Sequence, residues 1–144
     1  MEREVAASEA FLALTAHMKR HFRERVSTYG LTAAQAHVLL RLRVEAPVPS
    51  RALAEAVGID AGNLTSILDV LEAKDLVSRT PCTTDKRYKL LALTPAGQRR
   101  VEQLQERLHA DLPLFSGLTT TEAASLTRLL SKAASSAGSA PTPG

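Results

Sequence analysis

The chain has 144 residues, which is long enough for one domain with its own core but too short for a second independent core. Hydrophobic residues make up 44% of it, yet tryptophan is absent and aromatic residues are few, so aliphatic side chains must form the core, a composition that favours helices. A single cysteine excludes disulfide-stapled and zinc-finger classes, and without a membrane span or signal peptide we expect a cytoplasmic protein.

Two helices are predicted in the N-terminal part of the chain. Apolar residues recur at spacings of three or four from Ala6 to Tyr29 and predict one long helix, which Gly30 ends. Thr32 and Gln35 then form a T-x-x-Q capping box, which predicts the start of a second helix.

The next two helices are shorter and have the pattern of a helix-turn-helix. Ser50 is predicted to cap a third helix through Val57, and Asp60 to cap a fourth helix that runs to about Lys74. A helix-turn-helix needs a small residue at the crossing, a flexible turn and an apolar inner face. An ordinary pair of amphipathic helices would meet part of these requirements. The residues predicted to meet them are Leu53, Ala54, Val57, Gly58, Ile59, Leu64, Ile67, Leu68 and Leu71.

The outer face of the fourth helix carries small or hydrogen-bonding side chains, whereas a helix facing solvent more often carries Lys and Glu. Such side chains at the N-terminal end of a recognition helix can approach base edges in the major groove. Because its first two turns contain no Arg or Lys, we expect no arginine that reads guanine from this helix.

Two short strand candidates, Leu76 to Thr80 and Lys89 to Leu93, predict a hairpin directly after this helix. Basic residues are concentrated there: the window 79–100 contains six bases and one acid, a local charge of +5, while the whole chain carries +3. A solvated charged face could explain such a window. A hairpin beside a helix-turn-helix is instead a wing, whose bases would contact DNA.

We assign different roles to the residues of the wing. Narrow minor grooves favour an inserted arginine, so Arg87 is predicted to enter the minor groove while Lys86 and Lys89 contact phosphates. Asp85 is predicted to hold the turn or Arg87 in place. The predicted DNA-binding residues are Arg51, Ala61, Gly62, Asn63, Thr65, Ser66, Arg79, Lys86, Arg87 and Lys89, and the predicted wing-stabilising residues are Asp69 and Asp85.

Two more helices are predicted after the wing. Pro95 begins a fifth helix that runs to about Leu112, and Pro113 marks its end. The capping box at 119–122 begins a last helix that ends near Ala134, and the tail SSAGSAPTPG is expected to be disordered.

The segment 85–94, DKRYKLLALT, resembles the D-x-R-x-x-x-L-x-L-T signature of MarR-type transcriptional regulators. The similarity in layout extends from about Phe11 to Leu130. It implies a homodimer whose winged helix-turn-helix lobes read DNA as a pair and whose terminal helices form the dimer. Many members have glycine where this chain has Asp75, and aspartate tolerates left-handed backbone conformations better than most residues.

The predicted fold is therefore mainly α with a small β-hairpin. We expect an N-terminal dimerisation helix at 1–30, a winged helix-turn-helix DNA-binding lobe at 31–95, C-terminal dimerisation helices at 96–134 and a disordered tail at 135–144. The terminal helices have apolar stripes outside the winged-helix core, and pairing two chains would bury them. Recognition helices about one DNA turn apart, roughly 34 Å, predict a pseudo-palindromic operator.

Four residues are candidates for sensing a signal. His17 and His21 are spaced to chelate a metal and His37 could approach them, but supporting motifs are absent, so no metal or other cofactor is expected. The resemblance implies a small aromatic effector, which makes the three histidines candidate pocket residues. Neighbouring Lys and Arg could lower the pKa of the Cys82 thiol and make it redox-active, although an incidental thiol is the alternative.

The predicted function is a sequence-specific regulator that binds double-stranded DNA, a ligand-responsive repressor acting as a homodimer. The alternatives are a metal- or redox-responsive regulator of the same fold, or a winged-helix module for protein contacts, which would not need Arg87 flanked by lysines. An enzyme is not expected, because the sequence contains no phosphate-binding loop, nucleophile elbow or metal-hydrolase motif. No membrane partner is expected either.

Overall fold

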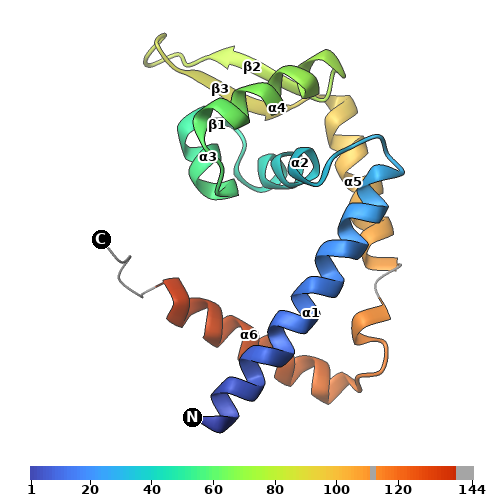
Figure 1. The fold of residues 1–144 in the computed structure, drawn as a ribbon. Helices are drawn as coiled ribbons and strands as arrows, with labels where there is room; N and C mark the ends of the chain where they lie inside the picture. The colour runs from blue at the N-terminus through green and yellow to red at the C-terminus, as the bar shows by residue number, and fades with distance from the viewer. Residues whose placement is uncertain (111–112, 139–144) are drawn as a thin grey trace. The chain divides into compact units, whose positions relative to one another are not determined.

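The computed structural model describes residues 1–110 and 113–138 (Figure 1). The chain divides into two compact units, Met1–His109 and Ala110–Gly144, each of which is described by itself. Among the described residues, no helix is both long enough and apolar enough to cross a membrane. The elements in chain order are α1 (Glu2–Ser27), α2 (Ala33–Glu45), β1 (Val48–Pro49), α3 (Ser50–Val57), α4 (Ala61–Ala73), β2 (Val77–Pro81), β3 (Lys89–Leu93), α5 (Pro95–Ala110), the 3-10 helix η1 (Pro113–Phe115) and α6 (Thr120–Gly138).

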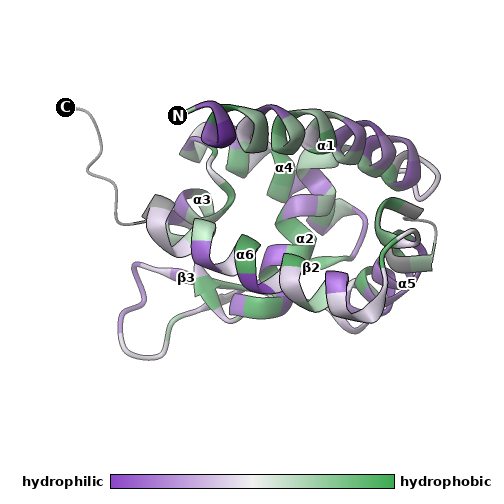
Figure 2. Cartoon of the chain, turned by 90° about the horizontal axis from the view of Figure 1, so that it is seen from below, coloured by the Kyte–Doolittle hydropathy of each residue, from purple (hydrophilic) through white to green (hydrophobic). Residues whose placement is uncertain are grey.

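Helix α1 begins earlier and ends earlier than predicted, because Glu2 and Glu4 suit the positive end of its dipole and because the chain turns after Ser27. Gly30 lies in this turn with φ 66°, a left-handed conformation that favours glycine. Only the C-terminal end of α1 enters the core, through the buried Val26. Further towards the N-terminus, hydrophobic residues alternate with hydrophilic ones along the helix (Figure 2), and the side chain of Phe11 is 55% exposed.

Two cations bind carbonyl groups in the turn that follows α1. Nζ of Lys74, the residue that follows α4, donates a hydrogen bond of 2.6 Å to the carbonyl oxygen of Gly30. Arg100 of α5 donates one of 3.0 Å to the carbonyl oxygen of Tyr29, and its guanidinium lies 5.9 Å from the Tyr29 ring centroid. These bonds join the turn that follows α1 to α5 and to the end of α4.

Helix α2 begins at the predicted capping box, which is confirmed. The Thr32 hydroxyl accepts the amide N–H of Gln35 at 3.1 Å, and the Gln35 side chain accepts the amide N–H of Thr32 at the same distance. α2 supplies a central part of the core through Ala36, Val38, Leu39 and Leu42, all buried.

The helix-turn-helix is present, with one correction to its first cap. Ser50 is the first residue of α3 and not its cap, because Pro49 takes the capping position and ends strand β1. Gly58 follows α3 with φ 76°, as expected for the turn. Asp60 caps α4 as predicted, since its carboxylate accepts the amide N–H of Asn63 at 2.9 Å.

The hairpin is part of a three-stranded antiparallel sheet in the order β1-β3-β2. In the hairpin, Val77 pairs with Leu93 and Pro81 with Lys89. Strand β1 was not predicted: it has two residues, and Val48 pairs with Leu91 on the other edge of β3. A proline suits this position because an edge strand can lack one donor.

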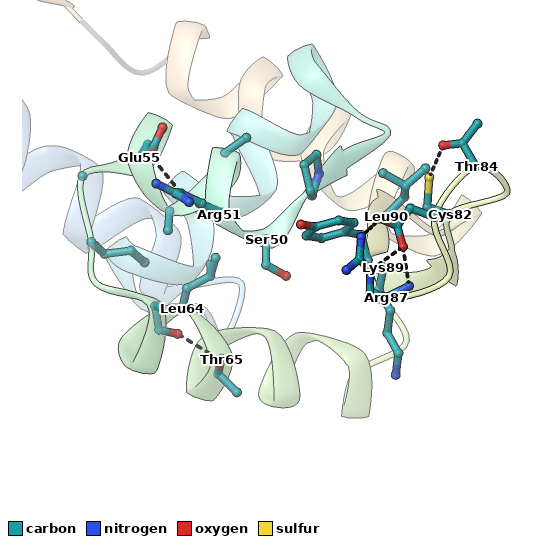
Figure 3. Close-up of a pocket in the computed structure, with 18 residues that line it drawn as sticks. Ser50, Arg51, Glu55, Leu64, Thr65, Cys82, Thr84, Arg87, Lys89 and Leu90 are labelled. Carbon is teal, nitrogen blue, oxygen red and sulfur yellow. Dashed lines mark hydrogen bonds and ion pairs between the residues drawn. The ribbon is translucent and has the colours of Figure 1, made fainter.

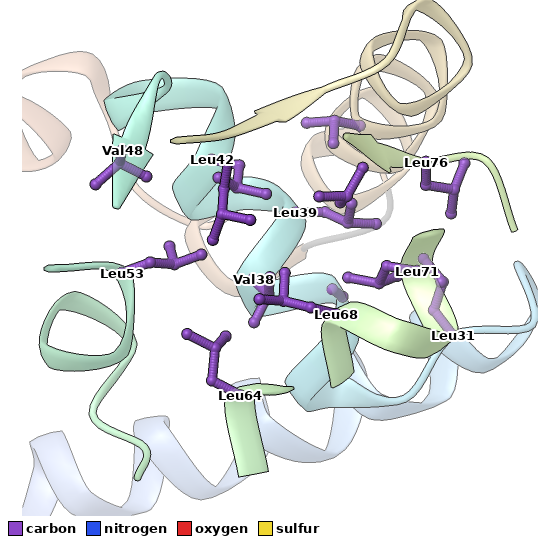
Figure 4. Close-up of a cluster of buried hydrophobic side chains, with 14 of the residues drawn as sticks. Leu31, Val38, Leu39, Leu42, Val48, Leu53, Leu64, Leu68, Leu71 and Leu76 are labelled. Carbon is purple, nitrogen blue, oxygen red and sulfur yellow. The ribbon is translucent and has the colours of Figure 1, made fainter. Parts of the chain in front are cut away.

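The core lies between α2, α3, α4 and the sheet, where leucine side chains converge (Figure 4). Burying one such side chain contributes about 1.5–3 kcal/mol to folding. On α4, Leu64, Leu68 and Leu71 are buried, whereas Ile67, predicted on the inner face, is half-buried. The large side chains that are fully buried are Leu39, Leu42, Leu53, Leu64, Leu68, Leu71, Leu91, Leu104, Val26, Val38 and Val101.

The junction between the hairpin and α5 depends on a close approach of two backbone segments. A Cβ atom on Gly97, in the first turn of α5, would lie 1.9 Å from the carbonyl oxygen of Leu76, so only glycine fits there. Thr94 strengthens the junction: its amide donates to the same Leu76 oxygen at 3.1 Å, and its hydroxyl accepts the amide of Gly97 at 2.9 Å. Asp75 has φ 56°, the left-handed conformation considered for it.

In the second unit, Thr119 and Glu122 form the predicted capping box of α6. α6 continues to Gly138 and not only to Ala134, so the first four residues of the predicted tail, 135–138, are helical. The small Ser and Ala residues there continue the helix, and Ser135 bonds back to the carbonyl of Ser131 at 3.0 Å. The predicted end of α5 at Leu112 and the rest of the predicted tail, 139–144, lie outside the described residues.

Candidate nucleic-acid interface

The outer face of α4 gathers the small polar residues that were predicted to meet DNA. Every third or fourth residue of the opposite face is a buried leucine, so the remaining positions of the first turns point away from the core. The exposed residues of this outer face are Ala61, Gly62, Asn63, Thr65, Ser66 and Asp69.

The side chains of Asn63, Thr65 and Ser66 already have hydrogen-bond partners in α4 or at its cap. The Thr65 hydroxyl donates to the carbonyl of Ala61 at 2.9 Å, and the Ser66 hydroxyl donates to that of Gly62 at 3.3 Å. The Asn63 side-chain amide donates to the Asp60 carboxylate. The backbone amide of Asn63 is the main reason why the pKa of Asp60 is lowered. Sequence reasoning identified Asp60 as a cap but missed this second, side-chain bond.

At the tip of the wing, Asp85 holds Arg87. One carboxylate oxygen of Asp85 accepts the backbone N–H of Arg87 at 3.1 Å and its Nε–H at 3.0 Å, while the other accepts from Nη2 at 2.8 Å. This pairing with the guanidinium lowers the pKa of Asp85 and raises that of Arg87. The Arg87 side chain nevertheless remains 84% exposed. An arginine that is both oriented and accessible can contact a ligand without first being ordered.

Three other basic side chains of this region are exposed. Lys86 and Lys89 lie on the wing, and Arg51 lies on α3, where it pairs with Glu55 at 3.4 Å.

Arg79 is bonded inside the fold. It pairs with Asp69 at 2.8 Å and with Glu72, both on α4, and its side chain is only 25% exposed. This arrangement supports the wing-stabilising role of Asp69, and it favours a structural role for Arg79 over the predicted DNA contact.

The helix-turn-helix and the wing border a common groove of about 1160 Å³. Figure 3 shows Ser50 and Arg51 of α3, Thr65 of α4, and Arg87 and Lys89 of the wing around it.

Cys82 also lines this groove, with its sulfur 3.1 Å from the Thr84 hydroxyl. The pKa of Cys82 is lowered, as predicted, but the cause differs from the one predicted. Hydrogen bonds from the Thr84 hydroxyl and the backbone of Asp85 and Thr84 stabilise the thiolate, while the negative charge of Asp85 opposes them. Basic side chains are not the cause.

The three histidines lie outside the groove and in separate settings. The ring of His37 stacks on Phe22 with centroids 4.5 Å apart, and burial lowers the pKa of His37. His17 lies 2.8 Å from Arg20, measured between Nδ1 and Nη2. The Nε2 atom of His21 is buried and has no hydrogen-bond partner among the described residues. Within that part of the chain, no three His, Cys, Asp or Glu side chains are grouped to hold a metal ion.

A helix-turn-helix followed by a sheet-borne hairpin with a basic tip defines a winged helix-turn-helix protein. The sequence profile of the MarR family matches residues 31–89. The multiple antibiotic resistance protein MarR of Escherichia coli (strain K12) is 37% identical over 115 residues, which are 78% of this chain and 80% of that protein. The chain belongs to the MarR family of transcriptional regulators, which confirms the fold and the family that the wing signature predicted.

Solved structures of MarR from E. coli are similar along most of the chain. The apo form of wild-type MarR superposes with a TM-score of 0.78 and 33% identity, covering 88% of this chain and 94% of that one. A mutant MarR complexed with operator DNA gives a TM-score of 0.72 and 32% identity, with 91% of this chain and 95% of that one covered.

Proposed function

We propose that this chain is a sequence-specific DNA-binding repressor that binds a pseudo-palindromic operator as a homodimer. The observation that carries the proposal is the shared groove, which is lined by Ala61 and Thr65 from the N-terminal end of α4 and by the oriented, exposed Arg87 of the wing. The structure of a mutant E. coli MarR with operator DNA, which this chain resembles, supports the same use of the fold.

In the proposed complex, α4 enters the major groove and the wing reaches the adjacent minor groove. The side chains of Asn63, Thr65 and Ser66 would face base edges, while Lys86 and Lys89 neutralise phosphates. Because Asp85 already holds the Arg87 guanidinium, less side-chain entropy is lost when it inserts.

The dimer is proposed from apolar side chains that a single chain leaves exposed. On α1, Phe11 and Leu12 are 55% and 66% exposed, and on α6 Leu129 is 52% exposed. A second copy would cover such residues. We therefore assign dimerisation to 1–30 and 96–134, with the DNA-binding lobe at 31–95 between them.

A response to a small aromatic carboxylate is proposed for the region around His37. The stack of His37 on Phe22 supplies an aromatic surface there. Such an effector can lower operator affinity only if it binds the released state more tightly than the DNA-bound state. Oxidation of Cys82 is the second candidate signal, favoured by the lowered pKa of its thiol and by its place in the groove.

Selection of bound sequences from random duplexes tests the proposal with the full-length protein. We expect an enriched site with two-fold symmetry and half-sites about one DNA turn apart, centre to centre. Recovery of an unenriched pool would contradict sequence-specific binding, and an enriched site without symmetry would contradict binding as a homodimer.

A further inference from the structure

The carboxylate of Asp60 makes one more bond than a helix cap requires. Its Oδ1 accepts the backbone N–H of Asn63 at 2.9 Å, which is the usual capping bond. Its Oδ2 accepts a hydrogen from the side-chain amide of the same residue. Both oxygens therefore act on Asn63, one on the backbone and one on the side chain.

The surrounding residues make room for this arrangement. A Cβ atom on Gly62 would lie 3.3 Å from Oδ1 of Asp60, tighter than nine in ten real contacts of this kind, so a side chain at this position would require the carboxylate to shift by a few tenths of an ångström. Neither Thr65 nor Ser66 competes for it, because their hydroxyls donate to carbonyls of the helix. Asn63 itself is exposed at the end of α4 that we propose to enter the major groove.

Counting the donors of the Asn63 amide shows what remains for DNA. A carboxamide has one oxygen and two N–H bonds, and one N–H is taken by Asp60. One oxygen and one N–H are left, which match the N6–H donor and the N7 acceptor that adenine shows in the major groove. An amide without the Asp60 bond could turn over and offer these groups in the reverse order.

The charge of Asp60 supports a role beyond capping. Serine caps a helix about as well as aspartate does, and it would not bring a negative charge towards phosphates. Aspartate, however, offers a separate oxygen to each of the two Asn63 donors, whereas serine has only one side-chain oxygen for both.

We infer that Asp60 is a positioning residue for sequence readout: it holds the side-chain amide of Asn63 in the orientation that reads one adenine in each half-site. This inference rests on the proposed function, because it requires α4 to lie in the major groove of an operator.

The test compares operator discrimination among Asn63→Ala, Asp60→Ser, the double variant and the wild type. Each position of both half-sites is substituted in turn, and the ratio of affinities for matched and substituted duplexes is measured with full-length protein. Asn63→Ala should remove discrimination at one adenine, a loss of about tenfold. Asp60→Ser should reduce the same ratio by about three- to tenfold. The double variant should match Asn63→Ala, because Asp60 acts only through Asn63.

Two controls separate positioning from folding. The melting temperature of Asp60→Ser shows whether the variant keeps its capped helix. If it does not fold, Asp60→Asn takes its place in the test, because asparagine retains a capping oxygen but lacks the second acceptor. Affinity for a scrambled duplex should rise or stay constant in both variants, because a negative charge is removed.

Three results would overturn the inference. Full discrimination by Asp60→Ser would leave Asp60 as a cap only, and lost discrimination at a position other than that of Asn63 would mean that Asp60 reads a base itself. Wild-type protein that selects no sequence would overturn the proposed function, and this inference with it.

Discussion

At the scale of single residues, Arg87 combines two properties that usually exclude each other. Its side chain is 84% exposed, yet Asp85 accepts three of its N–H groups. Exposed ion pairs contribute little to stability, so this pair should matter more for the direction of the guanidinium than for the free energy of unfolding.

Replacing Arg87 by alanine should weaken operator binding strongly. We expect a loss of about 1–3 kcal/mol per half-site and a shallower dependence of the binding constant on salt, because one cation leaves the minor groove. Lys86→Ala, the matched control beside it, should weaken matched and scrambled duplexes alike, since a phosphate contact carries no base information. Isotherms at several salt concentrations measure both effects. Wild-type affinity of Arg87→Ala for both duplexes would show that the wing stays outside the groove.

Gly97 is the residue at which a single methyl group should disturb the fold most. Gly97→Ala would place Cβ 1.9 Å from the Leu76 carbonyl, and the required shift should lower the free energy of unfolding by about 3 kcal/mol. Gly117, where a Cβ would meet nothing within 4 Å, provides the control, and Gly117→Ala should change stability by less than about 0.5 kcal/mol. Denaturant unfolding measures the free energy of unfolding of both variants, and equal losses would contradict the close approach of Gly97 to the Leu76 carbonyl.

At the scale of elements, the pairing of Arg79 with Asp69 and Glu72 attaches β2 to α4. The wing therefore has a side-chain connection to the recognition helix in addition to the chain between them. Cations and carboxylates on facing elements can fix the angle between those elements even where each bond contributes little energy.

Arg79→Ala and Lys89→Ala should separate stability from DNA contact. Arg79→Ala should lower the free energy of unfolding by about 1 kcal/mol and leave the salt dependence of DNA binding near that of wild type. Lys89→Ala should leave the free energy of unfolding near that of wild type and make the salt dependence of DNA binding shallower, because its exposed side chain contacts phosphate in the proposed complex. Thermal melts and salt titrations measure the two quantities. A clearly shallower salt dependence for Arg79→Ala would support the predicted DNA contact.

The features that could be predicted from sequence are those decided by neighbouring residues. The caps at Thr32 and Asp60 and the wing signature each lie within a few positions, and the structure contains all of them. Strand β1 could not be predicted, because two residues have no periodicity and Val48 pairs with the distant Leu91. The partners of Arg79 were missed for the same reason: they lie on another element.

The candidate site was predicted in outline and not in its internal bonds. Spacing along α4 identified its outer face, and residue type identified Arg87 as the tip of the wing. Sequence does not show which way a side chain turns. Only the structure therefore shows the bond between Asp60 and the Asn63 amide and the cause of the lowered pKa of Cys82.

At the scale of the whole molecule, we expect a homodimer formed by the terminal helices. The exposed side chains of Phe11 and Leu12 on α1 and of Leu129 on α6 supply the apolar surface. Sedimentation equilibrium at micromolar concentration should give twice the chain mass. Leu12→Glu should shift the protein towards the monomer, whereas Glu9→Gln, a nearby exposed polar position, should not. A monomeric wild type would contradict this expectation.

The hydrogen bonds from Lys74 and Arg100 to the carbonyl groups of Gly30 and Tyr29 have a mechanical consequence. Because Lys74, which follows α4, and Arg100 of α5 bind the same short turn, they restrict motion at the end of α1. In the proposed dimer built through α1, the distance between the two recognition helices would be set by the angle at which α1 leaves the lobe. A small tilt there would therefore change which half-site spacing the protein can span.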